Sequence, residues 1–185
     1  GRPEKPDHAQ PVAPTPAPNG DRVAVFRRGA PDSDVWLFDT KRGVLSRFTT
    51  TPGEDIFPAW SRDGSRIAFT SVRSQQGVAI YAKPTAGTDN DTLLVAPTPD
   101  ETFPCDWSPD GRTLVFTRRT EKTGWDVWAL PVAGGNPSPH IQTDADERNA
   151  QISPDGKWIA YVANTSGREE IYVQPFPNGG TAVQV

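Results

Sequence analysis

The sequence lacks several features that mark common classes of protein. It has no run of basic residues and a formal net charge of −4, which argues against nucleic acid as a partner. No stretch approaches the roughly 18 consecutive apolar residues of a membrane-spanning helix, so no membrane span is predicted. The single cysteine, Cys105, has no second cysteine with which to form an internal disulfide, and it leaves the redox compartment undecided.

Methionine is absent as well. A natural reading frame begins with methionine, so we expect a processed product or a piece of a longer protein. No signal peptide is found. The 185 residues are enough for one domain with a hydrophobic core.

One five-residue turn recurs along the chain. Its full form is Trp107-Ser108-Pro109-Asp110-Gly111, with variants at residues 60–64 and 152–156 and a worn copy at Asn19-Gly20. The four glycines stand at positions 20, 64, 111 and 156, in steps of 44, 47 and 45 residues. A period in the forties is typical of repeat architectures.

The residue types of this turn indicate a hairpin. Proline presets φ at the second position of the turn, aspartate tolerates the third, and glycine accepts the positive φ that ends it. We therefore expect a tight connection between two strands, which builds the fold and carries no chemistry.

Strand patterns continue in phase with the turn. An apolar strand begins three residues after each glycine, at Val23, Ile67, Leu114 and Ile159. An apolar-aromatic pair follows at Val35-Trp36, Ile80-Tyr81, Val127-Trp128 and Ile171-Tyr172. The sequence therefore predicts four repeats of four antiparallel strands, at 19–51, 52–97, 98–144 and 145–185, after a proline-rich linker or arm at 1–18. No segment has the sustained 3.6-residue period of a helix.

The second strand of each repeat is apolar at consecutive positions. A strand with this pattern is covered on both faces, and small four-stranded sheets are covered in this way when they stack radially. The predicted fold is all-β: a β-propeller of four-stranded antiparallel blades. Trp60, Trp107 and Ile152 are expected to fill the space between blades.

These residues resemble the TolB-type propeller repeat, a relative of the WD40 repeat. Its pattern is Trp-Ser-Pro-Asp-Gly, an Ile-Ala-Phe-like strand, Ile-Tyr and a Gly-Gly turn, and the likeness covers roughly residues 19–185. Arg62 stands where proline is usual, and Ile152 where tryptophan is usual. Residues 123–130 and 153–177 resemble, more closely, the C-terminal propellers of some bacterial Ser/Thr protein kinases.

The resemblance implies six blades in a closed ring, of which four repeats are visible here. Missing repeats were removed, or two chains pair through exposed blade faces, or the chain closes as a four-bladed ring; the first two are favoured. The resemblance also implies a location in the bacterial envelope, periplasmic or extracytoplasmic.

Motifs of catalysis are missing. The only histidines are His8, in the linker, and His140, in an outer strand. There is no Gly-x-Ser-x-Gly elbow, phosphate-binding loop, His-Glu-x-x-His or Cys-x-x-Cys. We therefore predict no independent active site and no cofactor.

Two acidic stretches have a composition typical of calcium ligands. They are Asp89-Asn90-Asp91 and Asp32-x-Asp34. Neither continues into a twelve-residue calcium loop. Turn formation by Asp and Asn explains both better, so no metal site is predicted.

Acidic residues precede the inner strand of repeats two, three and four. They are Glu54, Asp55, Asp100, Glu101, Asp144, Asp146 and Glu147. In a propeller these loops meet at one mouth of the central channel, where carboxylates attract a cation or a basic peptide. The candidate ligand-binding residues are Glu54, Asp55, Glu101, Asp146, Glu147 and Arg148. Solvated loop acids are the simpler interpretation, and Arg148 could pair with neighbouring acids and cancel part of their field.

Two functional hypotheses follow. The first is a non-catalytic scaffold that binds a protein, peptide or ligand, as the sensor region of a larger envelope protein such as a receptor Ser/Thr kinase. The second is an accessory or gating domain of a serine peptidase. A third interpretation is a propeller fragment made to study how repeats assemble.

Overall fold

The computed structural model describes residues 14–28, 32–86 and 90–185, which form sixteen strands and no helix. The strands are β1 (Thr15–Pro16), β2 (Arg22–Arg27), β3 (Asp34–Asp39), β4 (Val44–Arg47), β5 (Glu54–Trp60), β6 (Arg66–Ser74), β7 (Gly77–Pro84), β8 (Thr92–Thr98), β9 (Thr102–Trp107), β10 (Thr113–Thr120), β11 (Gly124–Pro131), β12 (Ser138–Ile141), β13 (Glu147–Ile152), β14 (Trp158–Ala163), β15 (Glu170–Pro175) and β16 (Val183–Gln184). Within the same ranges, no helix has the length and apolar character needed to cross a membrane.

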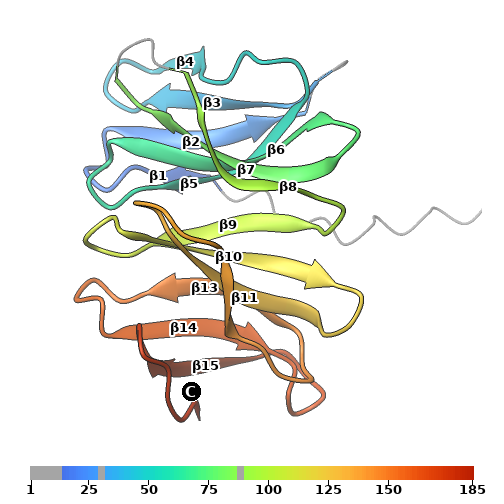
Figure 1. The fold of residues 1–185 in the computed structure, drawn as a ribbon. Helices are drawn as coiled ribbons and strands as arrows, with labels where there is room; N and C mark the ends of the chain where they lie inside the picture. The colour runs from blue at the N-terminus through green and yellow to red at the C-terminus, as the bar shows by residue number, and fades with distance from the viewer. Residues whose placement is uncertain (1–13, 29–31, 87–89) are drawn as a thin grey trace, which may run out of the picture.

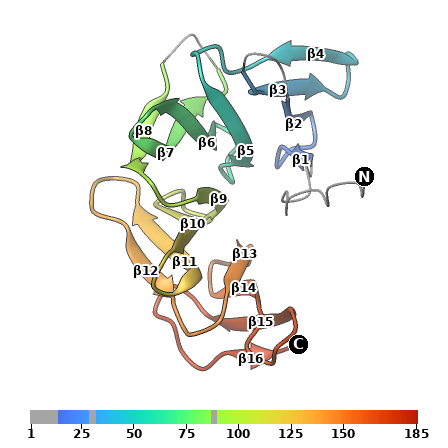
Figure 2. The same ribbon diagram turned by 90° about the vertical axis from the view of Figure 1, so that its right-hand side faces the viewer.

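The strands make four separate four-stranded antiparallel sheets, each in chain order. We call β1–β4, β5–β8, β9–β12 and β13–β16 blades 1 to 4. The blades follow one another along an arc, with β1, β5, β9 and β13 on its concave side and β4, β8, β12 and β16 on its outside (Figures 1 and 2). The predicted all-β architecture of propeller blades is confirmed.

A cage of hydrogen bonds explains the recurring turn. In blades 2, 3 and 4 the serine hydroxyl donates to the aspartate carboxylate at 2.6 Å. The same carboxylate accepts the backbone N–H two residues later at 3.0–3.1 Å, and the serine oxygen accepts the N–H that opens the next strand at 2.9–3.0 Å. Gly64, Gly111 and Gly156 have φ values of 70°, 68° and 71°, in the left-handed region that glycine tolerates best.

Apolar side chains fill the spaces between blades. We call the face of a blade toward the next blade its trailing face, and the opposite one its leading face. Trp60, Ile67 and Phe69 pack on blade 1; Trp107, Leu114 and Phe116 pack on blade 2; Ile152, Ile159 and Tyr161 pack on blade 3. Each interface therefore joins the trailing face of one blade to the leading face of the next, and the predicted positions of Trp60, Trp107 and Ile152 are confirmed.

The first inner strand is the shortest of the four. β1 has two residues, which pair with Val23 and Ala24, and it lies in the segment that the sequence assigns to the linker. Pro16 stands where blade 2 has Trp60, so a small ring replaces a large one. The limits of the linker at 1–18 and of the repeats stay predictions.

Candidate functional site

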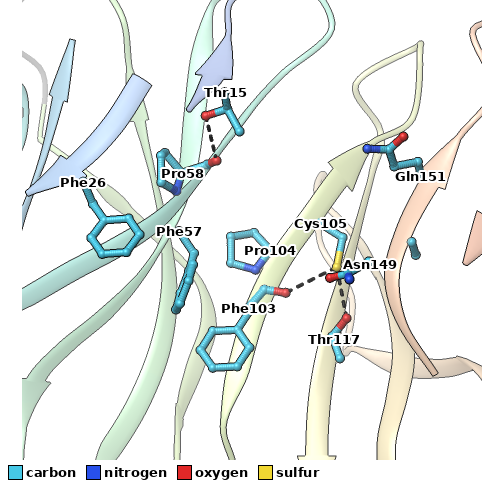
Figure 3. Close-up of a pocket in the computed structure, with 11 residues that line it drawn as sticks. Thr15, Phe26, Phe57, Pro58, Phe103, Pro104, Cys105, Thr117, Asn149 and Gln151 are labelled. Carbon is cyan, nitrogen blue, oxygen red and sulfur yellow. Dashed lines mark hydrogen bonds between the residues drawn. The ribbon is translucent and has the colours of Figure 1, made fainter. Parts of the chain in front are cut away.

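A pocket of about 290 Å³ opens on the concave side of the arc. Figure 3 shows its lining. Strands β5, β9 and β13 supply most of it, and β1, β2 and β10 add one residue each: Thr15, Phe26, Phe57, Pro58, Phe103, Pro104, Cys105, Thr117, Asn149, Ala150 and Gln151. Apolar side chains and prolines dominate, and a few polar groups stand among them. This composition is typical of sites that bind a small ligand or a side chain.

Bulges in the inner strands orient these side chains toward the pocket. In the pairing of β5 with β6, of β9 with β10 and of β13 with β14, the inner strand has one more residue than its partner at the same place in the repeat. At two of the bulges a non-glycine residue has positive φ: Phe57 at 52° and Asn149 at 56°. A bulky residue at positive φ is uncommon and persists where the surroundings hold it. The bulges thereby turn residues of neighbouring strands toward one shared hollow.

An aromatic row crosses three blades beside the pocket. The Phe26 and Phe57 ring centroids lie 5.2 Å apart and those of Phe57 and Phe103 4.7 Å apart, both edge to face. Phe103 stacks on Trp125 at 5.6 Å. The Arg119 and Arg148 guanidinium groups lie 5.8 and 5.7 Å from the Trp125 centroid, within reach of a cation–π interaction. The row presents apolar surface with cationic groups at one end.

Cys105 lies in the wall of the pocket. Its Sγ contacts the Thr117 hydroxyl at 3.1 Å and the Phe103 carbonyl oxygen at 3.7 Å (Figure 3). Burial raises the pKa of the thiol, with the Thr117 hydrogen bond acting in the opposite direction. The neutral thiol is therefore favoured, and it behaves as a small apolar wall residue and not as a nucleophile.

The predicted acids of blade 2 differ in exposure. Glu54 is exposed at the start of β5, whereas Asp55 is fully buried. Asp55 accepts a hydrogen bond from the Ser71 hydroxyl at 2.5 Å and pairs with Arg73 at 3.4 Å. Burial raises the pKa of Asp55, and the Ser71 and Arg73 contacts oppose the rise. Asp55 therefore links strands inside blade 2.

The acids of blades 3 and 4 also have partners. Glu101 is exposed and pairs with Arg119 at 3.1 Å. Asp146 accepts the Trp125 N–H at 3.0 Å and pairs with Arg148 at 3.3 Å, so part of its charge is cancelled.

Glu147 is a buried carboxyl. It accepts the Thr143 hydroxyl with Oε1, and within the described ranges no partner reaches Oε2. Burial is the main cause that raises the pKa of Glu147, and the Thr143 hydrogen bonds oppose the rise.

The structure thus divides the predicted site from the observed pocket. Glu54, Asp55, Glu101, Asp146, Glu147 and Arg148 lie where their blades begin, and none of them lines the pocket. Their role as ligand-binding residues stays a prediction. The pocket residues were not singled out from the sequence, although the Phe-Pro pair that precedes the tryptophan in blades 2 and 3 was visible there.

The other residues considered from the sequence are the acids of the two calcium-like stretches and the two histidines. Asp91 pairs with Arg73 and Asp34 with Arg47, while Asp89 and His8 lie outside the described residues. His140 packs edge to face on Phe176, and burial lowers its pKa. In the part of the chain that the structure describes, no group of three or more His, Cys, Asp or Glu side chains could hold a metal ion.

Comparisons with known proteins agree with the fold. A family model described as the TolB beta propeller domain matches residues 6–124. A protein assigned as TolB from Agrobacterium tumefaciens gives a TM-score of 0.81 at 19% identity, over 94% of this chain and 61% of that one. TolB from Acinetobacter baumannii gives 0.76 at 20% identity, over 94% of this chain and 42% of that one.

A relative found by sequence is the uncharacterized peptidase YuxL of Bacillus subtilis (strain 168). It is 30% identical over 77 residues, which are 38% of this chain and 12% of that protein. The chain is thus similar to parts of longer proteins, since the matches cover 61%, 42% and 12% of their lengths.

Proposed function

The chain belongs to the TolB β-propeller domain family, and on this premise we propose that its concave face is a non-catalytic binding surface for an apolar segment of a protein or peptide. The blades supply a rigid scaffold, and the inner strands with their bulges supply the site.

The pocket is the observation that carries the proposal. Its volume of about 290 Å³ lies at the small end of the roughly 300–1,000 Å³ of ligand sites, which suits one or two side chains better than a cofactor. Phe57 and Phe103 offer ring surface, while Asn149 and Gln151 offer amide groups that can bind a peptide backbone.

Two exposed acids, Glu54 and Glu101, add a charged feature to the proposed binding surface. Glu54 and Glu101 are exposed where blades 2 and 3 begin, and Arg119 offsets part of the Glu101 charge. A basic residue next to the apolar segment would therefore meet negative charge chiefly at Glu54. A sensor region of a larger envelope protein, such as a receptor Ser/Thr kinase in the periplasm, would use such a surface to bind its signal.

A second candidate is the propeller of a serine peptidase. The likeness to the YuxL peptidase favours it. Since the match covers only 12% of that protein, most of that protein lies outside the matched part. The concave surface would then contact a peptide substrate, and the catalytic groups would lie in another domain.

Peptide selection tests the proposal. A random peptide library displayed on phage is selected against the wild-type chain, and Kd values of the recovered peptides are measured by fluorescence polarisation. Gln151→Trp fills the exposed rim of the pocket, and Phe103→Ala removes a ring from its wall. We expect each to weaken binding by about tenfold or more, since a well-packed anchor contributes over about 1 kcal/mol.

The matched control is Arg112→Trp, in a hairpin turn that does not line the pocket. It should leave the Kd within about twofold, a change below 0.5 kcal/mol. Recovery of no peptide, or of peptides that bind all three variants equally, would contradict the proposal. Glu54→Gln combined with Glu101→Gln should weaken only peptides that contain Lys or Arg.

A further inference from the structure

Two buried carboxyl groups lie at the corner where blade 3 passes into blade 4. Asp126 is fully buried and Glu147 is 1% exposed. Asp126 Oδ2 accepts hydrogen bonds from the Thr123 hydroxyl at 2.5 Å and the Gln142 amide at 3.1 Å. Glu147 Oε1 accepts one from the Thr143 hydroxyl. The other oxygens, Asp126 Oδ1 and Glu147 Oε2, are buried without a partner in the described part of the chain, so a positive group near them is stabilising.

Contacts between neighbouring residues bring the two carboxyls close to each other. Asp146 accepts the Trp125 N–H at 3.0 Å, so the residue before Glu147 touches the residue before Asp126. Burial is the largest cause that raises the pKa of Glu147, and the negative charge of Asp126 adds to it. Among the described residues, no lysine or arginine forms an ion pair with either carboxyl, and Arg148 pairs with Asp146 instead.

The repeat places the same pair of acids between blades 1 and 2. Asp34, like Asp126, directly precedes the buried valine of the third strand of its blade. Asp55, like Glu147, stands five residues before the end of the inner strand. Here each acid has a guanidinium partner, at 2.8 Å for Asp34 and 3.4 Å for Asp55; the two partners are Arg47 and Arg73. The chain thus neutralises buried acids at this place with arginine.

Both arginines are replaced at the corner between blades 3 and 4. Pro139 stands where blade 1 has Arg47, opposite the tryptophan of the third strand. Thr165 stands where blade 2 has Arg73, two residues after the residue that pairs with the acid across the sheet. Blades 3 and 4 therefore keep the two acids without the cations that accompany them in blades 1 and 2.

A hollow of about 320 Å³ opens beside Thr165. Its other lining residues are Thr143, Asp144, Ala145 and Asn164. Asp144 is exposed and offers a carboxylate, while Asn164 and the threonines offer neutral oxygen atoms. Thr143 also connects the hollow with the buried acids, because its hydroxyl donates to Glu147. The hollow is therefore polar, with an acid in its wall and buried carboxyls behind it.

We propose that this hollow binds the guanidinium group of an arginine side chain that a partner protein presents, in the place that Arg73 takes in blade 2. The guanidinium donates to the Asp144 carboxylate and to the oxygen atoms of Asn164 and the threonines, and its charge compensates the buried acids. A planar fork of N–H donors suits several oxygen acceptors at once. The inference goes beyond the proposed function, because the hollow and the concave pocket share no residue.

NMR titration tests the proposal with N-acetylarginine amide as the probe. The backbone N–H resonances of Thr143, Asp144 and Thr165 should shift and saturate. N-acetylcitrulline amide, which has a similar shape and no charge, should shift them little. Asp144→Asn combined with Glu147→Gln should raise the Kd of the arginine probe by about tenfold or more, since it removes two charged groups. Equal shifts with the citrulline probe or with calcium chloride, or an unchanged Kd in the double variant, would overturn the guanidinium site.

A second test supplies the arginine from the chain itself. Thr165 is exposed, and Thr165→Arg should raise the Tm by about 2–4 °C and abolish the response to the arginine probe. The matched control is Thr120→Arg, at the equivalent position of blade 3, where Thr102 replaces the buried acid; it should give no rise. Circular dichroism verifies that both variants keep their strands. An equal rise in both variants, no rise in Thr165→Arg, or probe binding by Thr165→Arg at the wild-type Kd would each overturn the proposal.

Discussion

Arg62 departs from the repeat, and we expect its substitution to be the most informative test of the fold. Blades 3 and 4 have Pro109 and Pro154 at this turn position. The Arg62 guanidinium pairs with Asp106 of blade 3 and donates to the carbonyl oxygens of Trp107, at 3.3 Å, and Ile152, at 2.6 Å. One side chain of blade 2 thus joins blades 3 and 4.

The cost of Arg62→Ala follows from the burial of the pair. The Arg62 and Asp106 side chains are 35% and 13% exposed. Breaking a fully buried pair costs roughly 3–5 kcal/mol, whereas an exposed pair contributes about 0.2–1 kcal/mol. Asp106 would keep the N–H groups of Trp107 and Ile152, at 2.8 and 2.9 Å. We therefore expect the free energy of unfolding to fall by about 2 kcal/mol.

A double-mutant cycle isolates the pair. Asp106→Ala installs the residue that blade 2 has at the equivalent position, Ala59. It should cost more than Arg62→Ala, because Arg62 loses its counter-charge and the N–H groups of Trp107 and Ile152 lose their acceptor. Urea denaturation of both single variants and the double variant should give a coupling energy of about 1–1.5 kcal/mol. Effects that add within about 0.5 kcal/mol would refute the reasoning, since independent sites add to that precision.

Two other predictions concern the interfaces and the turns. Trp107→Ala should lower the free energy of unfolding by about 3–5 kcal/mol in urea denaturation, because Trp107 is fully buried and its Nε1–H donates to Ala59; a loss below about 1.5 kcal/mol would contradict this. The Ser61 hydroxyl and the Ser65 N–H lower the pKa of Asp63 to about 2, so the stabilisation is present above the unfolded pKa near 4 and is lost as the pH falls toward 2. After a discount for solvent exposure, Asp63→Ala should cost about 1 kcal/mol at pH 7 and little at pH 2, and an equal cost at both pH values would argue against the carboxylate.

The blades could be predicted from the sequence because their causes are local and repeated. The turn serine, aspartate and glycine contact each other within five residues, so the copies in blades 2, 3 and 4 each carry a complete signal. Apolar pairs at a constant distance from each glycine then set two strands and the faces they cover. Only β1 lacked such a signal, since Pro16 stands where the other blades have a large side chain.

The pocket could not be predicted in the same way. It depends on bulges that place Phe57 and Asn149 at positive φ. Phenylalanine gives no sign of this conformation, and asparagine, although enriched there, adopts it in a minority of cases. The aromatic row joins Phe26, Phe57 and Phe103 from three blades, so its contacts exist only after the blades stack. The acids differ from the pocket in this respect. Their spacing was evident in the sequence, but the burial of Asp55 beside Arg73 was not.

Departures from the repeat are therefore the positions to examine for specific roles. Arg62 and Asp106 each differ from the equivalent residues in the neighbouring blades, and they differ together because they meet across an interface. A residue that breaks the repeat and is buried points to a contact inside the chain. The double-mutant cycle tests this rule, because a coupling energy near zero would show that Arg62 and Asp106 depart from the repeat for separate reasons.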